Sequence, residues 1–369
     1  MDPAAVNTNI TVDDFDSVLT YADPSVWSTP DPSPNNVKSG KFDPSKSPFL
    51  QGTYHTTTTP GASISFNFTG PAVYLFGASG PSYGSFEVVL DGGKPVTKSA
   101  YAAENASFPY LLFADDGLDY AQHSLTIKNL GKQGEDKSDG PGAFLFDFLR
   151  TTVQLGPAGA TIKNQTVEET SSSLTFTGTW GHNTSPAFSG GGSTFTNGNN
   201  ASFSLAFNAS AIYVFGDKKN DHGLYRVFLD DATEPTVLTG VSGCGGAFGQ
   251  TCEQQVPTLK YFASNLGEGE HRLRLENDAG SNESFFDLDS IVLTVPSVYA
   301  PRTLGSSSPG ANSSNPSSNP NSNSSNPSNP NAPPPSAALG IHPHFGLLNL
   351  LVLGVVGVQL VKGWSWGRR

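Results

Sequence analysis

The sequence predicts an all-β protein with two tandem β-sandwich domains, a disordered stalk and a C-terminal apolar anchor helix. Helix-forming patterns are scarce, because Met occurs once and no long segment repeats apolar residues at the spacing of a helix face. Turn-forming residues are abundant, with Gly 40 and Pro 28 among 369 residues. A segment of about 140 residues also occurs twice, which is typical of tandem domains.

The charge of the chain excludes one class of partner. There are 32 acidic and 20 basic residues, so the formal net charge is -12, and only 14% of the residues are charged. Nucleic acids are polyanions, so a protein with this excess of negative charge is poorly suited to bind them. We expect no nucleic-acid partner, and the low charged fraction is typical of a turn-rich extracellular protein.

The internal repeat is the strongest pattern in the chain. Residues 62–93 align without a gap to residues 201–232, at a constant spacing of 139 residues. The matching pairs include Phe68 with Phe207, Tyr74 with Tyr213, Phe76 with Phe215, Gly77 with Gly216, Gly84 with Gly223, Val88 with Val227, Leu90 with Leu229 and Asp91 with Asp230. We predict two sandwich domains, over residues 1–156 and 157–297.

Alternation of apolar and polar residues defines the strands within each copy. Ile64, Phe66 and Phe68 fall on one face of a strand, and the polar residues between them fall on the other. The next run, 72–77 or 211–216, is apolar on both faces and predicts a central, covered strand. Alternating strands over 86–90 and 225–229 follow, then strands around 125–127 and 273–275 and the final Phe-Asp-rich segments. Many short strands separated by turn residues predict a β-sandwich.

Two late segments resemble a known family. GEGEHRLRLEN with SFFDLDSIVLTV in the second copy, and AQHSLTIKN with FLFDFLRTTV in the first, are similar to the last strands of galactose-binding-like jelly-roll sandwiches. The tandem arrangement with TYHTTTTPGASISFNFTGPAVYLFGASGP also resembles uncharacterised, membrane-anchored fungal surface proteins. The resemblance covers roughly residues 10–297. It implies a jelly-roll fold and glycans as the class of ligand, with no catalytic residue to carry over.

Glycosylation motifs predict the secretory route. Ten N-x-[ST] sequons stand at Asn9, Asn67, Asn105, Asn164, Asn183, Asn200, Asn208, Asn282, Asn312 and Asn323. Residues 1–16 contain no signal peptide. We favour a missing first exon as the explanation; the alternative is that the chain does not enter the endoplasmic reticulum in the usual way. We expect the domains to be extracellular, on a plasma membrane or cell surface.

The C-terminal part predicts a stalk and an anchor. Residues 298–338 are rich in Asn, Ser and Pro and lack the apolar residues that a core needs, so we expect a disordered stalk. Residues 339–369 are expected to hold a membrane anchor, because 345–361 is almost wholly apolar and a basic, Trp-bearing tail follows it. A transmembrane helix and a GPI signal both fit this segment.

The cysteines predict a loop disulfide. Cys244 and Cys252 are the two cysteines of the chain and lie in one Gly-rich insert of the second copy. In a secreted protein a disulfide is the first interpretation of such a pair, and a metal pair is the second. We expect no metal and no cofactor, since no zinc, P-loop or dinucleotide motif is present.

One catalytic pattern occurs in the first copy. Residues 80–84 read G-x-S-x-G around Ser82 and follow a predicted strand, as in the nucleophile elbow of a hydrolase. The elbow needs a helix next, but a strand is predicted there, and the second copy has Asp221 where Ser82 would stand. We therefore predict no catalytic residue and interpret this segment as a plain loop.

Loop and aromatic residues are the candidates for ligand binding. Tyr83 in the first copy, and Asp221 and His222 in the second, follow the central strand, where loops of a rigid sandwich carry function. Trp27 and Trp180 hold similar positions and offer ring faces to a sugar, although core positions also suit them.

Two acidic residues are candidates for a structural ion. Asp147 and Asp287 match each other beside Phe in the last predicted strand, where a carboxylate needs a hydrogen-bond donor or an ion. Satisfaction by loop amides is the other interpretation.

These observations predict a cell-surface glycoprotein that recognises glycans or cell-wall polymers without catalysis. The alternative is a structural or adhesive surface protein that binds no small ligand. A hydrolase acting on a surface polymer is the third hypothesis.

Overall fold

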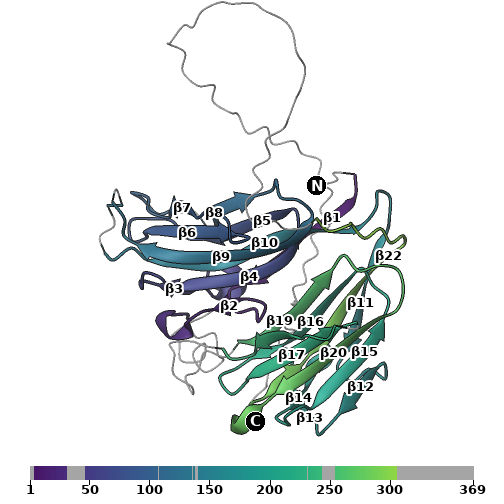
Figure 1. Cartoon of the computed structure of the whole chain (residues 1–369). Coiled ribbons are helices and arrows are strands. Elements are labelled where there is room, and N and C mark those ends of the chain that lie inside the picture. The colour runs from purple at the N-terminus through teal and green to yellow at the C-terminus, as the bar shows by residue number, and fades with distance from the viewer. Residues whose placement is uncertain are drawn as a thin grey trace, which may run out of the picture. The chain divides into compact units, whose positions relative to one another are not determined.

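The computed structural model describes residues 4–30, 46–106, 108–134, 136–137, 140–230, 232–242 and 254–305. Strands form the framework of this part of the chain, and its helices are single 3-10 turns (Figure 1). The turns are η1 Pro24–Val26, η3 Leu50–Gly52, η4 Ser189–Gly191 and η5 Gly280–Asn282. The predicted all-β class is confirmed. None of the described helices is long and apolar enough to cross a membrane.

The strands of residues 6–156 form two antiparallel sheets. One has the order β1-β10-β5-β8 with β3 beside β10, and the other has the order β2-β4-β9-β6-β7. The strands are β1 Val6–Asp13, β2 Thr20–Tyr21, β3 His55–Thr57, β4 Ser63–Gly70, β5 Ala72–Gly77, β6 Ser85–Leu90, β7 Val96–Ser99, β8 Tyr110–Asp115, β9 Ala121–Gly131 and β10 Phe144–Gly156. We refer to this half as the first sandwich.

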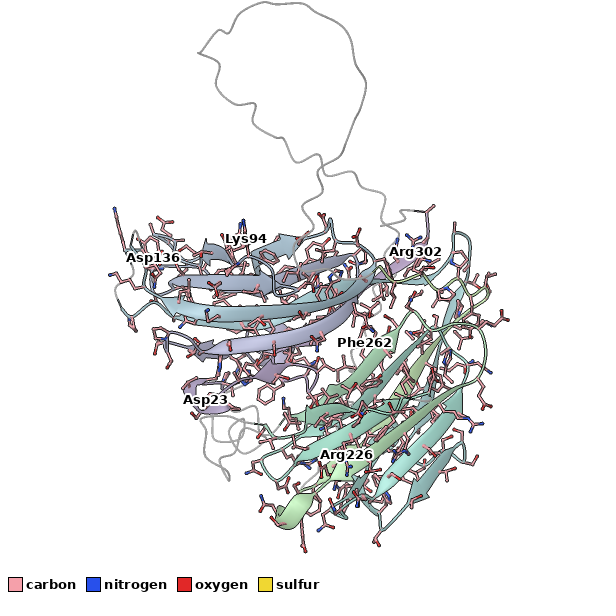
Figure 2. The ribbon with its side chains drawn as sticks, viewed as in Figure 1. Asp23, Lys94, Asp136, Arg226, Phe262 and Arg302 are labelled. Carbon is pink, nitrogen blue, oxygen red and sulfur yellow. The ribbon has the colours of Figure 1, made fainter. Side chains whose placement is uncertain are left out.

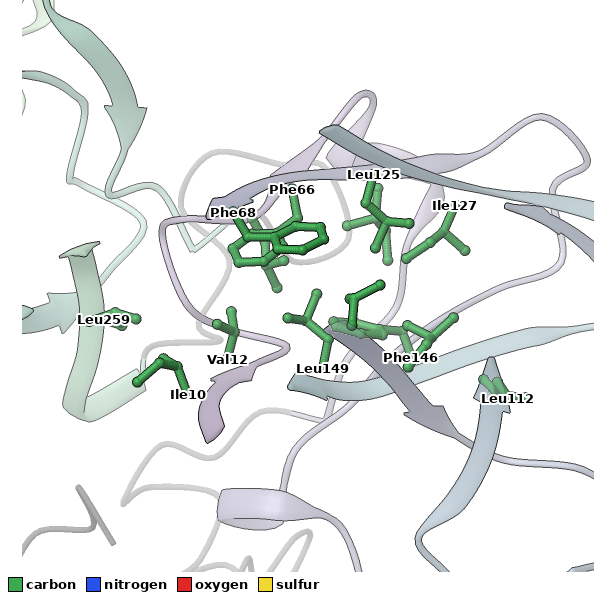
Figure 3. Close-up of a cluster of buried hydrophobic side chains, with 14 of the residues drawn as sticks. Ile10, Val12, Phe66, Phe68, Leu112, Leu125, Ile127, Phe146, Leu149 and Leu259 are labelled. Carbon is green, nitrogen blue, oxygen red and sulfur yellow. The ribbon is translucent and has the colours of Figure 1, made fainter. Parts of the chain in front are cut away.

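The core of the first sandwich combines apolar side chains from both of its sheets (Figure 3). On β4, Phe66 and Phe68 are 3% and 4% exposed, whereas Asn67 between them is exposed. The other sheet contributes Leu75 and Leu149, which are register partners on β5 and β10. The period-two alternation therefore places the apolar face inward, and burying each such side chain stabilises the fold by about 1.5–3 kcal/mol.

The strands of residues 162–296 repeat this arrangement as the second sandwich. Its sheets have the orders β11-β22-β16-β19, β12-β15-β20-β17-β18 and β13-β14-β21. The strands are β11 Ile162–Glu168, β12 Leu174–Thr177, β13 Gly181–Thr184, β14 Gly192–Thr196, β15 Ser202–Phe207, β16 Ala211–Lys218, β17 Leu224–Leu229, β18 Thr236–Thr239, β19 Gln254–Ser264, β20 His271–Asp278, β21 Phe286–Leu288 and β22 Ser290–Pro296. A separate apolar cluster draws on all three sheets.

Cross-strand ion pairs occupy matching outward positions in the two sandwiches. Glu87 of β6 is the register partner of Lys128 of β9, and their charged groups lie 2.6 Å apart. Arg226 of β17, labelled in Figure 2, faces Glu276 of β20 at 2.9 Å. The repeat keeps the pair but reverses its charges, so the register is shared while the side chains have diverged.

The register of the last strands differs from the predicted alignment. On β10, Leu149 is the partner of Leu75, and on β22, Ile291 is the partner of Val214. Because residues 75 and 214 are equivalent in the repeat, Leu149 corresponds to Ile291.

This register corrects the expected match between Asp147 and Asp287. Counting back along the strands, Asp147 corresponds to Asp289, and Asp287 corresponds to Leu145. A shift of two residues keeps each side chain on the same face of a strand, so alternation alone could not detect it.

Several predictions lie outside the described residues. They include the disulfide of Cys244 and Cys252, the sequons at Asn312 and Asn323, the anchor in 339–369 and the stalk from residue 306 onward. They stay predictions.

Candidate functional site

One end of each sandwich brings two loops together at equivalent places. In the first sandwich Tyr83 forms an isolated parallel bridge with Ala143, and in the second His222 forms one with Phe285. Both residues lie in the loop that follows the central strand, β5 or β16. Two of the predicted ligand-binding residues, Tyr83 and His222, therefore occupy the same place in the two copies.

The second sandwich holds a group of buried charges at this place. We call Asp217, His222, Lys260 and Asp287 the charged cluster; their exposed fractions are 0%, 4%, 0% and 1%. Asp217 belongs to β16, Lys260 to β19 and Asp287 to β21. The fold therefore joins charged side chains from three strands and one loop below the surface.

An ordered set of contacts links the charged cluster to its rim. His222 Nε2 lies 3.0 Å from Asp217 Oδ1, and His222 Nδ1 lies 3.0 Å from Asp221 Oδ1. Lys219 forms an ion pair with Asp217. Asp221 has a side chain that is 53% exposed and Lys219 one that is 22% exposed, so these two residues connect the cluster to solvent.

A hydrogen bond links the two acidic residues of the charged cluster. The backbone N–H of Asp217 donates a hydrogen bond to Asp287 Oδ1 at 3.1 Å. The other oxygen, Asp287 Oδ2, is buried and has no hydrogen-bond partner in the described part of the chain. Burial raises the pKa of Asp287 to about 6, and the negative charge of Asp217 adds to this.

The pKa of Asp217 is displaced in the opposite direction from that of Asp287. Burial opposes its ionisation, but the hydrogen bond and charge of His222, together with Lys219, outweigh burial and hold the pKa of Asp217 well below its usual range. For His222, burial lowers the pKa, but the contacts with Asp217 and Asp221 prevail and the net shift is upward. The two neighbouring carboxyl groups therefore titrate in different pH ranges, Asp287 near pH 6 and Asp217 well below it.

Lys260 completes the charged cluster. Its Nζ lies 5.9 Å from the ring centroid of Tyr225 and 5.7 Å from that of Phe286, and it has no hydrogen-bond partner among the described residues. Burial lowers the pKa of Lys260 to about 8, against the opposing effect of Asp217 and Asp287. A buried ammonium in contact with ring faces is available to an anionic or carbonyl group.

The first sandwich has apolar residues at the corresponding places. Leu145 occupies the position equivalent to Asp287, and Leu112 of β8 occupies the position equivalent to Lys260. A Cβ on Gly77 would meet Leu145 O at 2.1 Å and Leu112 Cδ1 at 2.7 Å. On Gly216, a Cβ would meet Asp287 O at 2.2 Å and Lys260 Cε at 3.0 Å. The backbone geometry is the same, and only the second copy carries the charges.

The two tryptophans pack against other aromatic rings. Trp27 is 1% exposed, and the rings of Tyr21 and Phe144 lie 5.2 Å and 6.4 Å from it. It is a core residue, which corrects its assignment as a ligand platform. Trp180 is half-buried against Phe176 and donates from Nε1 to the carbonyl oxygen of Thr177 at 3.0 Å.

Asp147 has a structural hydrogen bond. Its Oδ1 accepts from the backbone N–H of Leu50 at 3.0 Å, and Asp289 Oδ1 accepts from Ser189 N–H at 2.8 Å in the second copy. Within the described ranges no group of three or more His, Cys, Asp or Glu is placed to hold a metal ion. The structural ion at Asp147 or Asp287 stays a prediction.

Most of the sequons lie at accessible places. Among the sequons in the described residues, the asparagines are exposed at Asn9, Asn67, Asn105, Asn164, Asn200, Asn208 and Asn282, and half-buried at Asn183. These positions leave room for attached glycans.

Sequence reasoning missed Asp217 and Lys260. Asp217 directly follows the apolar run of 211–216, and Lys260 interrupts the segment Thr258–Tyr261 in a strand that flanks it. Burying a charged residue in a covered strand costs free energy unless the residue has a partner. A charged residue next to such an apolar run is therefore the pattern that could have indicated the site.

No family model matches the chain. The chain is 26% identical over 269 residues to the A type blood alpha-D-galactosamine galactosaminidase of Flavonifractor plautii, a match that covers 73% of this chain and 21% of that protein. It is 31% identical over 127 residues to the A type blood N-acetyl-alpha-D-galactosamine deacetylase of the same organism, covering 34% of this chain and 14% of that protein.

The solved structures include a family 35 carbohydrate binding module from Clostridium thermocellum. It has a TM-score of 0.25 and 15% sequence identity, and the match covers 35% of this chain and 98% of that one. At this TM-score we draw no conclusion from the likeness.

The relatives overturn the expectation of a non-catalytic protein. Both curated relatives are named as enzymes, and the longer match covers 73% of this chain. The prediction of glycan recognition without catalysis is therefore wrong. The chain spans about one fifth of the length of the first relative and about one seventh of the second.

Proposed function

We propose that this protein is a glycan-acting hydrolase and that the charged cluster of the second sandwich carries its reacting groups. The observation that supports this most is the pair of adjacent carboxyl groups whose pKa values are displaced in opposite directions. The names of the two curated relatives suggest the substrate class, glycans that carry galactosamine or its N-acetyl form.

The displaced pKa values suit an acid and a base. With a pKa of about 6, Asp287 exchanges a proton near neutral pH, whereas Asp217 stays ionised. In hydrolysis, water attacks the scissile carbon, its hydroxyl stays on that carbon and a proton passes to the leaving group. Asp287 would transfer that proton, and Asp217 would stabilise positive charge. His222 would keep Asp217 oriented through its 3.0 Å contact.

Burial of the charged cluster limits how a substrate can reach it. The members of the charged cluster are buried, and Asp221 and Lys219 reach solvent above them. A substrate would therefore meet the Asp221 and Lys219 rim first and would have to displace it to reach Asp287.

The first experiment measures hydrolysis by the full-length chain. Oligosaccharides ending in galactosamine or N-acetylgalactosamine are incubated with the protein, and released sugar and acetate are quantified separately. We expect product from the unchanged chain and at least a 100-fold loss in Asp287→Asn and Asp217→Asn. Asp119→Asn, an exposed carboxylate of the first sandwich, is the matched control. No product from the unchanged chain, or full activity in Asp287→Asn, would contradict the proposal.

We also propose that the protein is a fungal cell-surface glycoprotein with galactose-binding-like jelly rolls, anchored through residues 345–361. The accessible sequons and the apolar C-terminal segment support this location. The test is expression in a fungal host followed by N-glycosidase and phosphatidylinositol-specific phospholipase. A glycan shift without release supports a transmembrane helix, and release supports a GPI link. Absence of any glycan shift would reject the extracellular location.

A further inference from the structure

Four aromatic rings gather at the end of the first sandwich where the second sandwich carries its charges. Ring centroids of Phe49 and Tyr54 lie 4.4 Å apart, and those of Phe49 and Phe108 lie 4.7 Å apart. Tyr83 belongs to a loop that reaches the same end, because Ser79 O accepts from Ala106 N–H at 3.0 Å, two residues before Phe108. Burial raises the pKa of Tyr83, and Tyr54 adds to this effect. We call Phe49, Tyr54, Tyr83 and Phe108 the aromatic platform.

The aromatic platform is open to solvent on one side. Phe108 is 38% exposed, and the adjoining Tyr110 and Leu111 of β8 are 36% and 47% exposed. Most of the large apolar side chains in the described part of the chain are buried, so these three residues are exceptions. Neighbouring exposed aromatic residues are therefore informative, because clustered apolar surface marks an interaction site.

Hydrogen bonds from backbone N–H groups hold the loops of the platform in place. Asp147 Oδ1 accepts from Leu50 N–H at 3.0 Å and so fixes the turn between Phe49 and Tyr54. On the other side, Tyr83 N–H donates to Gly80 O at 3.2 Å. A preformed site loses little conformational entropy on binding.

The second sandwich cannot form the same platform. Phe188 stands at the place of Phe49 but is only 9% exposed, and Ser193 and His222 stand at the places of Tyr54 and Tyr83. The two ends have therefore diverged into one aromatic site and one charged site.

We infer that the aromatic platform binds the face of a neutral pyranose, with N-acetylgalactosamine as the ligand class. The rings of Phe49 and Phe108 would pack against sugar C–H groups, while the Tyr54 and Tyr83 hydroxyls would exchange hydrogen bonds with sugar hydroxyls. None of the four platform side chains is a carboxylate, so none would form an ion pair with the galactosamine ammonium, and the acetylated sugar is the chosen ligand. The choice of sugar rests on the proposed function; the site itself rests on the geometry above.

The test is saturation-transfer NMR and calorimetry of the full-length chain with N-acetylgalactosamine. Phe108→Ala is expected to weaken binding at least tenfold, and Tyr83→Phe about threefold. Leu224→Ala is the matched control, since it removes an apolar side chain that is 48% exposed in the second sandwich. All variants carry Asn105→Gln, so that no attached glycan lies beside Phe108.

The outcomes separate this inference from the proposed hydrolysis. Binding that depends on Phe108 without any turnover keeps the platform and rejects the hydrolase. Turnover that is unchanged in Phe108→Ala, or binding that Phe108→Ala does not weaken, overturns the platform. Absence of sugar binding together with Phe108-dependent association with a protein also overturns it. If both proposals hold, Phe108→Ala raises KM and leaves kcat unchanged.

Discussion

At the scale of single residues, the two copies carry side chains of different chemistry at places where their backbone geometry is equivalent. Gly77 and Gly216 each lie against a backbone carbonyl at equivalent places, yet the residue that carries this carbonyl is Leu145 in one copy and Asp287 in the other. Leucines at this place add to the core, whereas charges must satisfy one another. The charged cluster therefore has a cost in stability, which a duplicated domain tolerates when the charges serve a function.

The coupling inside the charged cluster makes a residue-scale prediction. Lys260→Leu removes a positive charge near Asp287, so the pKa of Asp287 should rise above about 6. Asp217→Asn removes a negative charge, so the same pKa should fall. NMR titration of the Asp287 carboxyl carbon measures both shifts, and the exposed Lys94→Leu should leave it unchanged. Shifts of the same sign in both variants would show that charge does not control this carboxyl.

At the scale of elements, a carboxylate in or beside the last strand tethers a 3-10 turn in each sandwich. Asp147 holds η3 and Asp289 holds η4, through hydrogen bonds to the first backbone N–H of each turn. The two turns start at residues 50 and 189, which have the spacing of the repeat. The tether occurs in both copies, and it explains why a buried acidic residue stands beside Phe148 in one copy and Ser290 in the other.

Loss of the tether should affect one turn at a time. In Asp147→Ala the Leu50 amide loses its acceptor, so its hydrogen exchange should become at least tenfold faster, while Ser189 is unchanged. Asp289→Ala should produce the reverse pattern. Asp147→Asn keeps an acceptor oxygen and should retain protection at Leu50. Equal exchange in the Ala and Asn variants would mean that the carboxylate is not the tether.

At the scale of the whole molecule, residues of the first sandwich contact the second through hydrogen bonds. Asp16 Oδ1 accepts from Leu259 N–H at 2.7 Å, and Ser17 N–H donates to Leu259 O at 2.9 Å. Leu259 also belongs to the same apolar cluster as Ile10 and Val12 (Figure 3). Burial raises the pKa of Asp16 to about 7 and lowers that of Lys218 to about 8.

These buried groups predict a minimum of stability near pH 8. Burial raises the pKa of Asp147 to about 8 and that of Asp289 to about 7, so the folded state binds more protons than the unfolded state between about pH 4 and 8. Stability from these carboxyl groups therefore falls as pH rises through that range. Lys218 and Lys260, with pKa values lowered to about 8, act oppositely, and stability should rise again from pH 8 to 10.

Thermal unfolding of the full-length chain at pH 5, 8 and 10 measures this profile. The loss from pH 5 to 8 should be on the order of 3 kcal/mol and should shrink in Asp147→Asn, which does not titrate. Asp217 loses its stabilising charge only below its unfolded pKa, so it does not affect this range. A transition temperature that rises steadily from pH 5 to 8 would contradict the assignment.

The candidate site was only partly predictable from the sequence. Tyr83, Asp221 and His222 were identified because they follow a central strand, and the structure places Tyr83 and His222 at equivalent positions. Their partners could not be predicted, because the register of the last strand is ambiguous by two residues and such a shift leaves the pattern of faces unchanged. Trp27 failed as a candidate because its aromatic ring also suits a core.

By itself the sequence determined the all-β class, the duplication and the inward face of each strand, because these depend on local alternation and on self-similarity along the chain. Only the tertiary structure decided that the two copies end in a charged cluster and an aromatic platform. Asp217 and Asp287, or Phe49 and Phe108, come from segments far apart in the chain, and pairing of the strands brings them together. That pairing is non-local, so no pattern within a single segment could encode it.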